Sequence, residues 1–402
     1  MNLLNRRDFF KLSLSGSWAF STFIPAVLLP QSKQEPKKKN GMIYRKLGRT
    51  GIDISEISLG GSPLPDWVLF RQIIDKGVNY IDTSATYQGG NSERQIGRLF
   101  KEARRDKIHV ATKFHLRGSW SVESIIKSVE GSLKRLGSDY IDVLMIHGAE
   151  NPAHLTDQRV LEAFQRMKKE GKYRFSGLSC HANHQEVVEA AAECGHYDVI
   201  QLGYNVYDIE KEEDPIKTYP DYLQTSGLRS IISLASSKGM GVIAMKALKV
   251  GGRRQDISKY ITPEGTVFQA MLKWVLANPY IASVVTEILN FSQMEEDLSI
   301  PGKSLTSSEK KALYRMVAET SRNYCHMCGT CQKACPQNIP TTGVLRFLSY
   351  FEGQGKKNLA RRQYNNLMKK GNTCRDCGAC EEVCPYKLPV RQLLRKARFH
   401  LA

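Results

Sequence analysis

The residues from Ile108 to His147 contain the pattern that decides the fold. An apolar run, Ile-His-Val-Ala-Thr-Lys-Phe, fills 108–114, an amphipathic stretch follows at Ser121–Leu136, and a second apolar run, Ile-Asp-Val-Leu-Met-Ile-His, fills 141–147. Short continuous apolar runs separated by helices are typical of strands in a parallel sheet that helices cover on its outer face. This stretch therefore predicts one β-α-β unit.

The same alternation recurs between Met42 and about Leu305, with further amphipathic helices expected at His184–Glu193 and Thr262–Ala277. Eight such units in roughly 260 residues predict an α/β fold of the (β/α)8 TIM barrel type, which usually needs about 250 residues. A doubly wound sheet is the alternative, but no Gly-x-Gly-x-x-Gly follows the first strand. The eight expected strands are Glu56–Gly60, Asn79–Thr83, Ile108–Phe114, Ile141–His147, Phe175–Ser179, Val199–Tyr204, Gly241–Lys246 and Ala282–Thr286.

In such a barrel the carboxyl ends of the strands carry the chemistry. Those ends offer Asp82 and Tyr87 after the second strand, Lys113 in the third and His147 in the fourth. Asp82 can supply the counter-charge that a buried Lys113 needs. We expect this ammonium to lower the pKa of the Tyr87 phenol, which makes it a better proton donor to a developing alkoxide. Taken singly, each residue could also be a polar strand-end group satisfied by its neighbours.

The motifs Asp82-Thr-Ser-Ala-Thr-Tyr87, Ala111-Thr-Lys113-Phe and Met145-Ile-His147-Gly resemble the catalytic tetrad motifs of the aldo/keto reductase superfamily. The resemblance covers the whole barrel. It implies that Tyr87 is the general acid/base, that Lys113 and Asp82 tune it, and that His147 positions a small carbonyl or alcohol substrate.

The resemblance also implies a site for NADP(H). Ser179 and Gln201, after the fifth and sixth strands, match the family's contacts to the nicotinamide carboxamide, but Cys180 stands where the family has asparagine. After the seventh strand, Lys246-Ala-Leu replaces the family's Ser-Pro-Leu, and Glu287 stands about where the family has a glycine beside the pyrophosphate. We expect Lys246 to compensate part of the repulsion between Glu287 and a pyrophosphate. Nucleotide use therefore rests on the resemblance, and a tightly bound nucleotide is one form that it could take.

Two runs of cysteines follow the barrel and hold eight of the ten cysteines. Each has the spacing Cys-x-x-Cys-x-x-Cys-x-x-x-Cys-Pro that holds 4Fe–4S clusters in bacterial-type ferredoxins, where the fourth cysteine completes the other cluster. The alternatives are zinc sites, which prefer paired cysteine knuckles, and a disulfide framework. We therefore predict two 4Fe–4S clusters, one bound by Cys325, Cys328, Cys331 and Cys384, and one by Cys374, Cys377, Cys380 and Cys335.

The residues between the two runs have apolar positions at helical spacing, which predicts two helical faces. This arrangement resembles the α-helical ferredoxin domains attached to respiratory and aldo/keto-reductase-like enzymes. The first face comprises Val344, Phe347, Leu348 and Phe351, and the second comprises Leu359, Tyr364, Leu367 and Met368.

The N-terminal residues Asn5-Arg6-Arg7-Asp8-Phe9-Phe10-Lys11 match the twin-arginine export pattern, and no charged residue follows until Lys33. The alternative is a chance Arg-Arg before a hydrophobic helix. Because the twin-arginine route exports folded proteins, it suits a protein with preassembled clusters. We expect a periplasmic protein, or one anchored to the outer face of the cytoplasmic membrane. Residues 31–40 resemble a solvated, flexible linker.

These features predict four regions: a signal segment at 1–30, a linker at 31–41, the barrel at 42–318 and a small, mainly helical two-cluster domain at 319–402. A capping box at Thr306–Glu309 opens a helix, expected at Thr306–Glu319, that fastens the barrel to this domain. Residues 207–227 are expected to form a lid near the pocket, with Tyr219, Asp221 and Tyr222 as candidate substrate contacts, and the default alternative is a surface loop packed on the barrel. His181 and His184 are expected to be polar rim residues.

The formal net charge of +18 lacks the aromatic-basic patterns of nucleic-acid binding. It predicts an acidic redox partner or an anionic membrane surface and no nucleic acid. The leading functional prediction is an exported oxidoreductase of the aldo/keto reductase type that interconverts a carbonyl and an alcohol, with electrons relayed by the clusters. The alternatives are an iron–sulfur electron-transfer subunit whose barrel is a docking scaffold, and an enzyme whose clusters are structural.

Overall fold

Eight parallel strands close into a barrel in the computed structural model, which describes residues 36–102, 105–116, 120–209, 227–248, 252–254, 257–367 and 373–402. Neighbouring strands follow one another in the sequence, and the last pairs with the first. This confirms the predicted (β/α)8 barrel. Its strands are β4 (Ile57–Gly60), β5 (Tyr80–Asp82), β6 (His109–Phe114), β7 (Ile141–His147), β8 (Tyr173–Cys180), β9 (Val199–Gly203), β10 (Gly241–Met245) and β11 (Ile281–Thr286).

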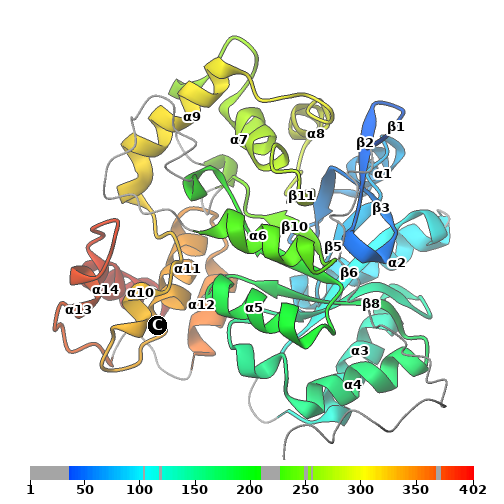
Figure 1. Cartoon of the computed structure of the whole chain (residues 1–402), viewed down its shortest axis with the longest axis horizontal. Coiled ribbons are helices and arrows are strands. Elements are labelled where there is room, and N and C mark those ends of the chain that lie inside the picture. The colour runs from blue at the N-terminus through cyan, green and yellow to red at the C-terminus, as the bar shows by residue number, and fades with distance from the viewer. Residues whose placement is uncertain are drawn as a thin grey trace, which may run out of the picture. The chain divides into compact units, whose positions relative to one another are not determined.

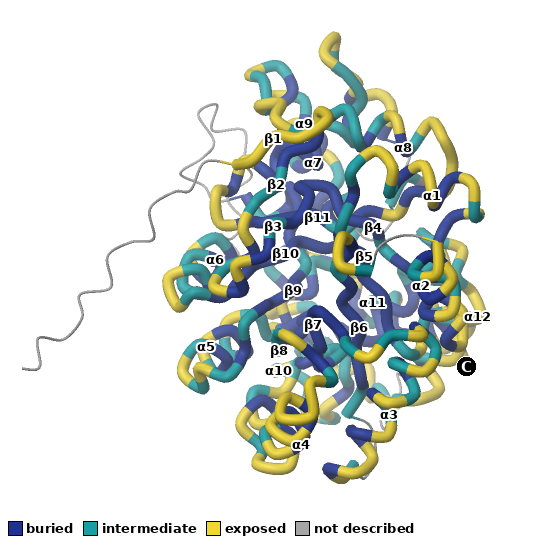
Figure 2. Tube along the Cα trace, turned by 90° about the vertical axis from the view of Figure 1, so that its right-hand side faces the viewer, coloured by how far each residue is buried: buried dark blue, intermediate teal, exposed yellow. Residues whose placement is uncertain are grey.

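A helix follows each barrel strand, and the helices surround the buried strands with their exposed faces outward (Figures 1 and 2). Helix α3 shows why these segments fold as they do, because Ser121 forms a capping box with Ser124 and Gly137 ends the helix at φ 57°. The helices are α1 (Trp67–Asp75), α2 (Asn91–Glu102), α3 (Val122–Leu136), α4 (Gln158–Lys169), α5 (His184–Cys194), α6 (Leu228–Ser237), α7 (Val267–Leu276) and α8 (Phe291–Leu298).

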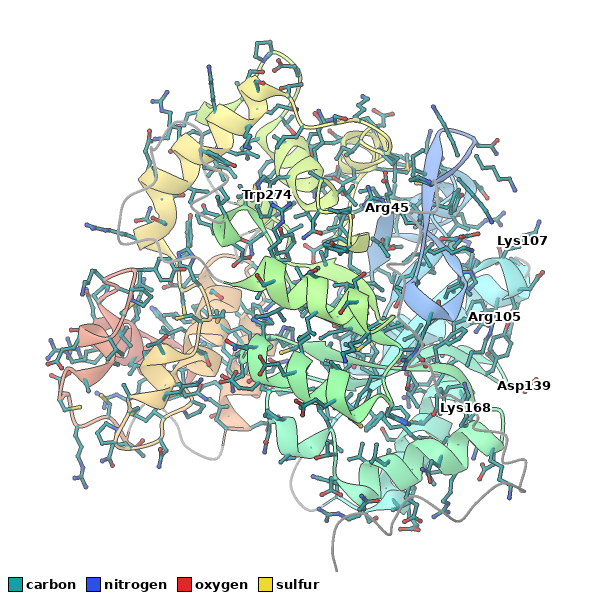
Figure 3. All side chains as sticks on the ribbon, in the orientation of Figure 1. Arg45, Arg105, Lys107, Asp139, Lys168 and Trp274 are labelled. Atoms are coloured by element: carbon teal, nitrogen blue, oxygen red, sulfur yellow. The ribbon has the colours of Figure 1, made fainter. Side chains whose placement is uncertain are left out.

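A small antiparallel sheet of β1 (Lys37–Lys39), β2 (Met42–Lys46) and β3 (Asp53–Ser55) lies at the end of the barrel where the strands begin. Leu47, Ile52 and Ile54 join the apolar cluster inside the barrel and close that end. Arg45, labelled in Figure 3, fastens the sheet. Its guanidinium donates to the carbonyl oxygens of Ile281 and Leu276 at 2.9 and 3.0 Å. The prediction of a flexible linker through residue 40 is wrong for Lys37–Lys39, which pair with β2.

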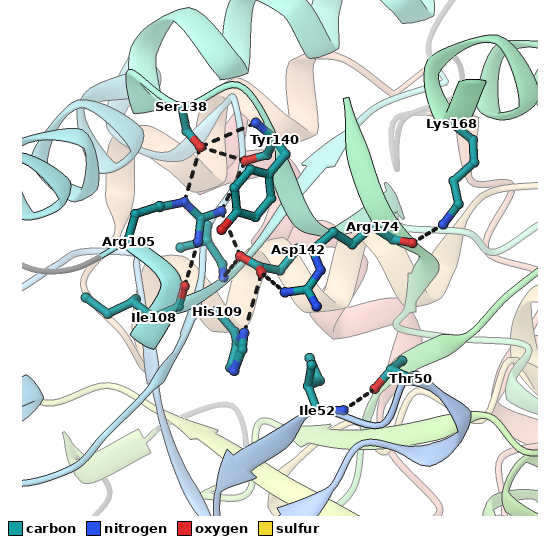
Figure 4. A network of polar contacts seen from close by, with 11 residues as sticks. Thr50, Ile52, Arg105, Ile108, His109, Ser138, Tyr140, Asp142, Lys168 and Arg174 are labelled. Atoms are coloured by element: carbon teal, nitrogen blue, oxygen red, sulfur yellow. Dashed lines mark hydrogen bonds and ion pairs between the residues drawn. The ribbon is translucent and has the colours of Figure 1, made fainter. Parts of the chain in front are cut away.

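The same end of the barrel contains a charged network centred on Asp142, at the start of β7 (Figure 4). Asp142 is buried and forms ion pairs with Arg105 at 2.8 Å and Arg174 at 3.2 Å. Burial alone would raise the pKa of Asp142, but the hydrogen bond from His109 and the charge of Arg105 hold it below its ordinary value. A network at the strand starts contributes to stability and not to chemistry, since barrel chemistry belongs at the opposite end.

The C-terminal domain is mainly helical and consists of two similar halves. Cys374 corresponds to Cys325, and α13 and α14 correspond to α10 and α11, with α12 packed on α11 and α14. A longer helix, α9, precedes the domain and is joined to α7 by the buried ion pair between Lys273 and Glu309 (2.6 Å). The bounds are α9 (Ser307–Thr320), α10 (Thr330–Lys333), α11 (Thr341–Glu352), α12 (Lys357–Asn365), α13 (Ala379–Glu382) and α14 (Val390–Leu401).

Most sequence-based bounds agree with the structure, including the capping box at Thr306. The helix expected from Thr262 begins only at Val267, because residues 262–265 form a short turn joined by a bridge between Thr262 and Gly265. The signal segment, the lid residues Tyr219, Asp221 and Tyr222, and Met368 lie outside the described residues. In the part of the chain that the structure describes, every helix is too short or too polar to cross a membrane.

Candidate active site

The four predicted catalytic residues come together at the end of the barrel where the strands finish. Asp82 ends β5, Lys113 lies in β6 and His147 ends β7, whereas Tyr87 begins a short 3-10 turn, Tyr87–Gly90, after β5. Lys113 and Asp82 are both buried and form a close ion pair, and the Lys113 ammonium also donates to the Thr83 carbonyl at 2.9 Å. The Lys113 Nζ atom lies 5.2 Å from the centre of the Tyr87 ring, in a cation–π geometry.

His147 faces the same place from the next strand. Its ring centre is 5.7 Å from that of Tyr87, edge to face, and it stacks on His115 at 4.1 Å. The Nδ1 atom of His147 lies 3.0 Å from the Ser84 hydroxyl, so this contact orients the ring. Ser84 and His115 therefore position His147, although sequence analysis did not single them out.

Electrostatics at Tyr87 differ from the expectation. Burial raises the pKa of Tyr87 well above its ordinary value, and the charges of Asp82 and Tyr350 raise it further. The expected lowering by Lys113 is therefore wrong, because Asp82 neutralises that ammonium at short range. Burial also lowers the pKa of Lys113, and the Asp82 carboxylate offsets only part of this effect. The phenol of Tyr87 is thus held in its protonated form, ready to donate.

A buried carboxylate supports this arrangement from the barrel's helical layer. Glu93 of α2 is fully buried, accepts a hydrogen bond from the Thr112 hydroxyl at 2.5 Å and forms an ion pair with Arg135 at 2.6 Å. Thr112 precedes Lys113 in β6, so Glu93 fixes the strand that carries the lysine. Sequence analysis missed Glu93, since one carboxylate within an amphipathic helix gives no pattern.

The residues expected to hold a nicotinamide are present, and some of their polar atoms already form hydrogen bonds within the protein. The Ser179 hydroxyl accepts a hydrogen bond from the Gly148 amide at 3.2 Å. Among the described residues, the buried Oε1 atom of Gln201 has no hydrogen-bond partner, while its Nε2 atom contacts the Met245 sulfur at 3.7 Å. Cys180 is buried, its thiol donates to the Ala182 carbonyl at 2.8 Å, and burial raises its pKa.

The C-terminal domain contacts the two rim positions expected to face a pyrophosphate. Lys246 at the end of β10 hydrogen bonds to Tyr350 of α11, with its Nζ atom 5.4 Å from the ring centre. Glu287, after β11, forms an ion pair with Lys356 at 2.8 Å. The expected compensation of Glu287 by Lys246 is therefore wrong, because each residue has a partner from the C-terminal domain.

These contacts decide how well a nicotinamide nucleotide fits. A pyrophosphate at this place would have to displace the Tyr350 hydroxyl from Lys246 and Lys356 from Glu287. The Glu287 carboxylate would then repel it. The described residues therefore do not fit NADP(H) in the position that the family resemblance implies.

The cysteine sets do fit two clusters with exchanged fourth ligands. One small cavity is lined by Cys325, Cys328, Cys331 and Cys384, and a second by Cys335, Cys374, Cys377 and Cys380. In the described part of the chain, no three His, Cys, Asp or Glu side chains are close enough to hold a single metal ion. The Cys-x-x-Cys-x-x-Cys-x-x-x-Cys-Pro spacing of both runs is the one that holds a cubane, whereas zinc sites prefer paired cysteine knuckles.

Backbone geometry in both halves supports the same conclusion. Met327 and Asp376 adopt positive φ angles of 60° and 58°, and their amides donate to the sulfur atoms of Cys325 and Cys374 at 3.5 and 3.4 Å. Such N–H···S bonds favour the thiolate form that a cluster requires and tune the cluster's potential.

The first cysteine set also borders the barrel. A cavity of about 220 Å³ lies between them, with Cys325 and Cys328 on one side and His181, His184 and Lys246 on the other. The Nδ1 atom of His181 and the Nε2 atom of His184 are buried and, among the described residues, have no hydrogen-bond partner. Both histidines are therefore cavity residues as well as rim residues. A second, more open cavity of about 420 Å³ is lined by His147, Glu150 and Asn183.

Comparison with known proteins agrees with this architecture. Residues 68–266 match the aldo/keto reductase family, and residues 318–385 match the 4Fe-4S dicluster domain. The uncharacterized oxidoreductase YqkF of Bacillus subtilis is 28% identical over 298 residues, covering 68% of this chain and 95% of that protein. The NADH-specific methylglyoxal reductase of Escherichia coli is 26% identical over 330 residues, covering 69% and 98%.

A solved aldo-keto reductase from Klebsiella pneumoniae in complex with NADPH shows the same fold. It has a TM-score of 0.54 and 22% identity, and the match covers 68% of this chain and 94% of that one. The chain is thus an oxidoreductase that combines an aldo/keto reductase domain on a (β/α)8 barrel with a C-terminal 4Fe–4S dicluster domain.

Proposed function

We propose that the chain is an exported oxidoreductase that interconverts a small carbonyl compound and its alcohol at Tyr87, with electrons relayed by two 4Fe–4S clusters. The observation that carries this proposal is the cavity in which Cys325 and Cys328 face the barrel rim at Lys246. A redox centre held by the first cysteine set would lie beside the active-site end of the barrel.

The barrel residues account for the acid–base part of the reaction. Carbonyl reduction takes up two electrons and two protons and yields one alcohol. Tyr87, protonated because burial raises its pKa, donates a proton to the carbonyl oxygen. His147, oriented by Ser84, hydrogen bonds to the same oxygen and holds it toward Tyr87. When bound, each cluster supplies one electron, so the pair matches the two electrons that the reaction requires.

A small, polar carbonyl compound suits the site, and the Escherichia coli relative named for methylglyoxal offers a practical probe. The electron donor is proposed to be an acidic protein or a carrier at an anionic membrane surface, because the chain has a formal net charge of +18. Export by the twin-arginine route is supported by Arg6 and Arg7 in the sequence. Changing both arginines to lysine should leave the protein in the cytoplasmic fraction, and unchanged periplasmic recovery would refute export by this route.

The experiment for the activity compares Tyr87→Phe with the intact holoprotein, using methylglyoxal as substrate and chemically reduced methyl viologen as donor. Tyr87→Phe should abolish turnover and leave the iron–sulfur absorption spectrum unchanged, because Tyr87 does not line either of the two cysteine cavities. Tyr280→Phe is the matched control, since Tyr280 is 42% exposed and precedes the start of β11, at the far end of the barrel. Turnover that survives in Tyr87→Phe would refute the assigned chemistry.

A second candidate function is an electron-transfer subunit whose barrel only docks the cluster domain. The contacts of Tyr350 and Lys356 with Lys246 and Glu287 favour it, because they cover rim positions that the family uses for a cofactor. It predicts that the clusters are reduced and reoxidised by protein carriers while no carbonyl compound is turned over.

A further inference from the structure

The proposed function creates a requirement for a second acid in the active site. A hydride donor delivers two electrons together with the hydrogen that becomes bonded to carbon. Electrons that arrive singly bring no hydrogen, so both hydrogens of the alcohol must come from acids. Tyr87 can supply only the one on oxygen. We therefore ask, on the basis of the proposed function, which acid supplies the hydrogen bonded to carbon.

Helix α11 places a phenol at the barrel mouth. Tyr350 hydrogen bonds to Lys246, whose backbone is held in the left-handed region at φ 58°. The chain after α11 is anchored too, because the Lys356 amide donates to the Tyr350 carbonyl at 2.9 Å. The Lys356 ammonium donates to the Ser62 carbonyl at 2.7 Å and pairs with Glu287. Tyr350 is thus fixed from both sides.

Charge complementarity fixes the whole domain in this position. Among the described residues, three ion pairs join the barrel rim to the C-terminal domain, and in each the acid belongs to the barrel and the base to the domain. They connect Glu150 with Arg346 (2.5 Å), Glu186 with Lys333, and Glu287 with Lys356 (2.8 Å). Since Arg346 lies one helical turn before Tyr350 in α11, its contact with Glu150 orients the same helix face.

The two phenols lie in opposite electrostatic environments. Burial alone would raise the pKa of Tyr350, but the cations Lys246, Arg346 and Lys356 outweigh burial and lower it below the ordinary value. The pKa of Tyr87 is raised instead, first by burial and then by the charges of Asp82 and Tyr350. Geometry connects the two sites: Lys246, whose Nζ atom lies 5.4 Å from the centre of the Tyr350 ring, lines one cavity with His181, whose ring centre is 6.4 Å from that of His147. Lys246 is itself buried, which lowers its pKa and prepares it to return a proton to Tyr350.

We propose that Tyr350 is the second catalytic acid of the barrel, contributed by the cluster domain through its contact with Lys246. In carbonyl reduction, Tyr87 donates its proton to the oxygen and Tyr350 donates its proton to the carbon. One carbonyl, two protons and two electrons from the reduced clusters give one alcohol and two oxidised clusters. Lys246 and solvent then return the protons to the phenolates. The active site is therefore complete only when the domain is docked.

The first test follows the hydrogen bonded to carbon. The holoprotein reduces methylglyoxal in D2O with reduced methyl viologen and no added nucleotide, and the alcohol is analysed by mass spectrometry. Deuterium on the carbinol carbon is expected, since both acids exchange with solvent. Protium there would overturn the proposal, because the hydrogen would then have come from a retained hydride donor.

The second test removes the acid. Tyr350→Phe should lower turnover about 100-fold or more, the range that a general acid contributes, while Tyr280→Phe should have no effect. Lys333→Gln controls for docking, because it breaks a rim ion pair that does not touch Tyr350. Lys246→Arg should retain most of the turnover that Lys246→Met loses. Unchanged turnover in Tyr350→Phe would overturn the proposal.

A third test needs no turnover. Ultraviolet difference absorption during a pH titration should show one tyrosine that ionises below the usual range in the intact holoprotein. That ionisation should be absent from Tyr350→Phe and retained in Tyr280→Phe, and its pKa should be shifted upward in Lys246→Met. Its persistence in Tyr350→Phe would contradict the assignment. If the intact protein reduces no carbonyl at all, the proposed function fails. If it does so with protium on carbon or without need of Tyr350, only this inference fails.

Discussion

Lys113→Met should strongly destabilise the barrel, because it leaves the Asp82 carboxylate buried without its counter-charge. Both side chains are almost fully buried, with 1% (Lys113) and 5% (Asp82) of their surface exposed. Removing one member of a buried ion pair costs about 3–5 kcal/mol. At about 2–4 °C per kcal/mol, the slope for large domains, that loss lowers the apparent unfolding temperature by about 6–20 °C.

The assay is far-ultraviolet circular dichroism during heating of the holoprotein at one fixed scan rate, since cluster loss makes unfolding irreversible. The double variant Asp82→Asn with Lys113→Met should recover most of the lost stability, because it removes the unpaired charge along with its partner. A loss below about 1 kcal/mol in Lys113→Met, or a double variant less stable than the single one, would refute the account of this pair.

Three further results are expected. Cys328→Ser should remove roughly half of the protein-bound iron measured by native mass spectrometry, since one of two cubanes loses a ligand, whereas Cys194→Ser should remove none. Burial lowers the pKa of His184 to about 4 in the folded protein, below its unfolded pKa of about 6.5. The stability that the neutral imidazole contributes is therefore complete above about pH 6.5 and is lost as pH falls toward 4. Denaturant titrations should show this loss in the intact protein but not in His184→Gln. Lys356→Glu should place like charges beside Glu287 and loosen the domain contact by up to about 1 kcal/mol. Faster limited proteolysis between barrel and domain would reveal this loosening, and an unchanged cleavage rate would argue against the contact.

The sequence predicted the barrel well because each strand is a continuous apolar run and each helix has a regular apolar face. All eight strands occur where expected, with ends that differ by a few residues. The helix expected from Thr262 was too long, since the turn at Thr262–Gly265 has no periodic signal to separate it from α7. Pairing of Lys37–Lys39 with β2 was also missed, because three consecutive lysines resemble a solvated segment.

The candidate site was predictable where local motifs carry it and unpredictable where distant segments meet. Asp82, Lys113 and His147 lie at strand ends, so topology alone places them together. The exchanged cysteine ligands followed from the spacing and the repeated pattern. Tyr350, by contrast, reaches Lys246 from a different domain, and no spacing in the sequence reports that contact. The direction of the Tyr87 pKa shift was missed as well, since it depends on burial.

One measurement tests the central claim most directly. The holoprotein is reduced anaerobically, freed of excess reductant and mixed with methylglyoxal, and cluster absorption and alcohol formation are followed in the same sample. The intact protein should reoxidise its clusters and form one alcohol for every two electrons lost, while Tyr87→Phe should remain reduced. Clusters that reoxidise equally in both proteins, or without any alcohol, would show that the barrel does not use these electrons for carbonyl chemistry.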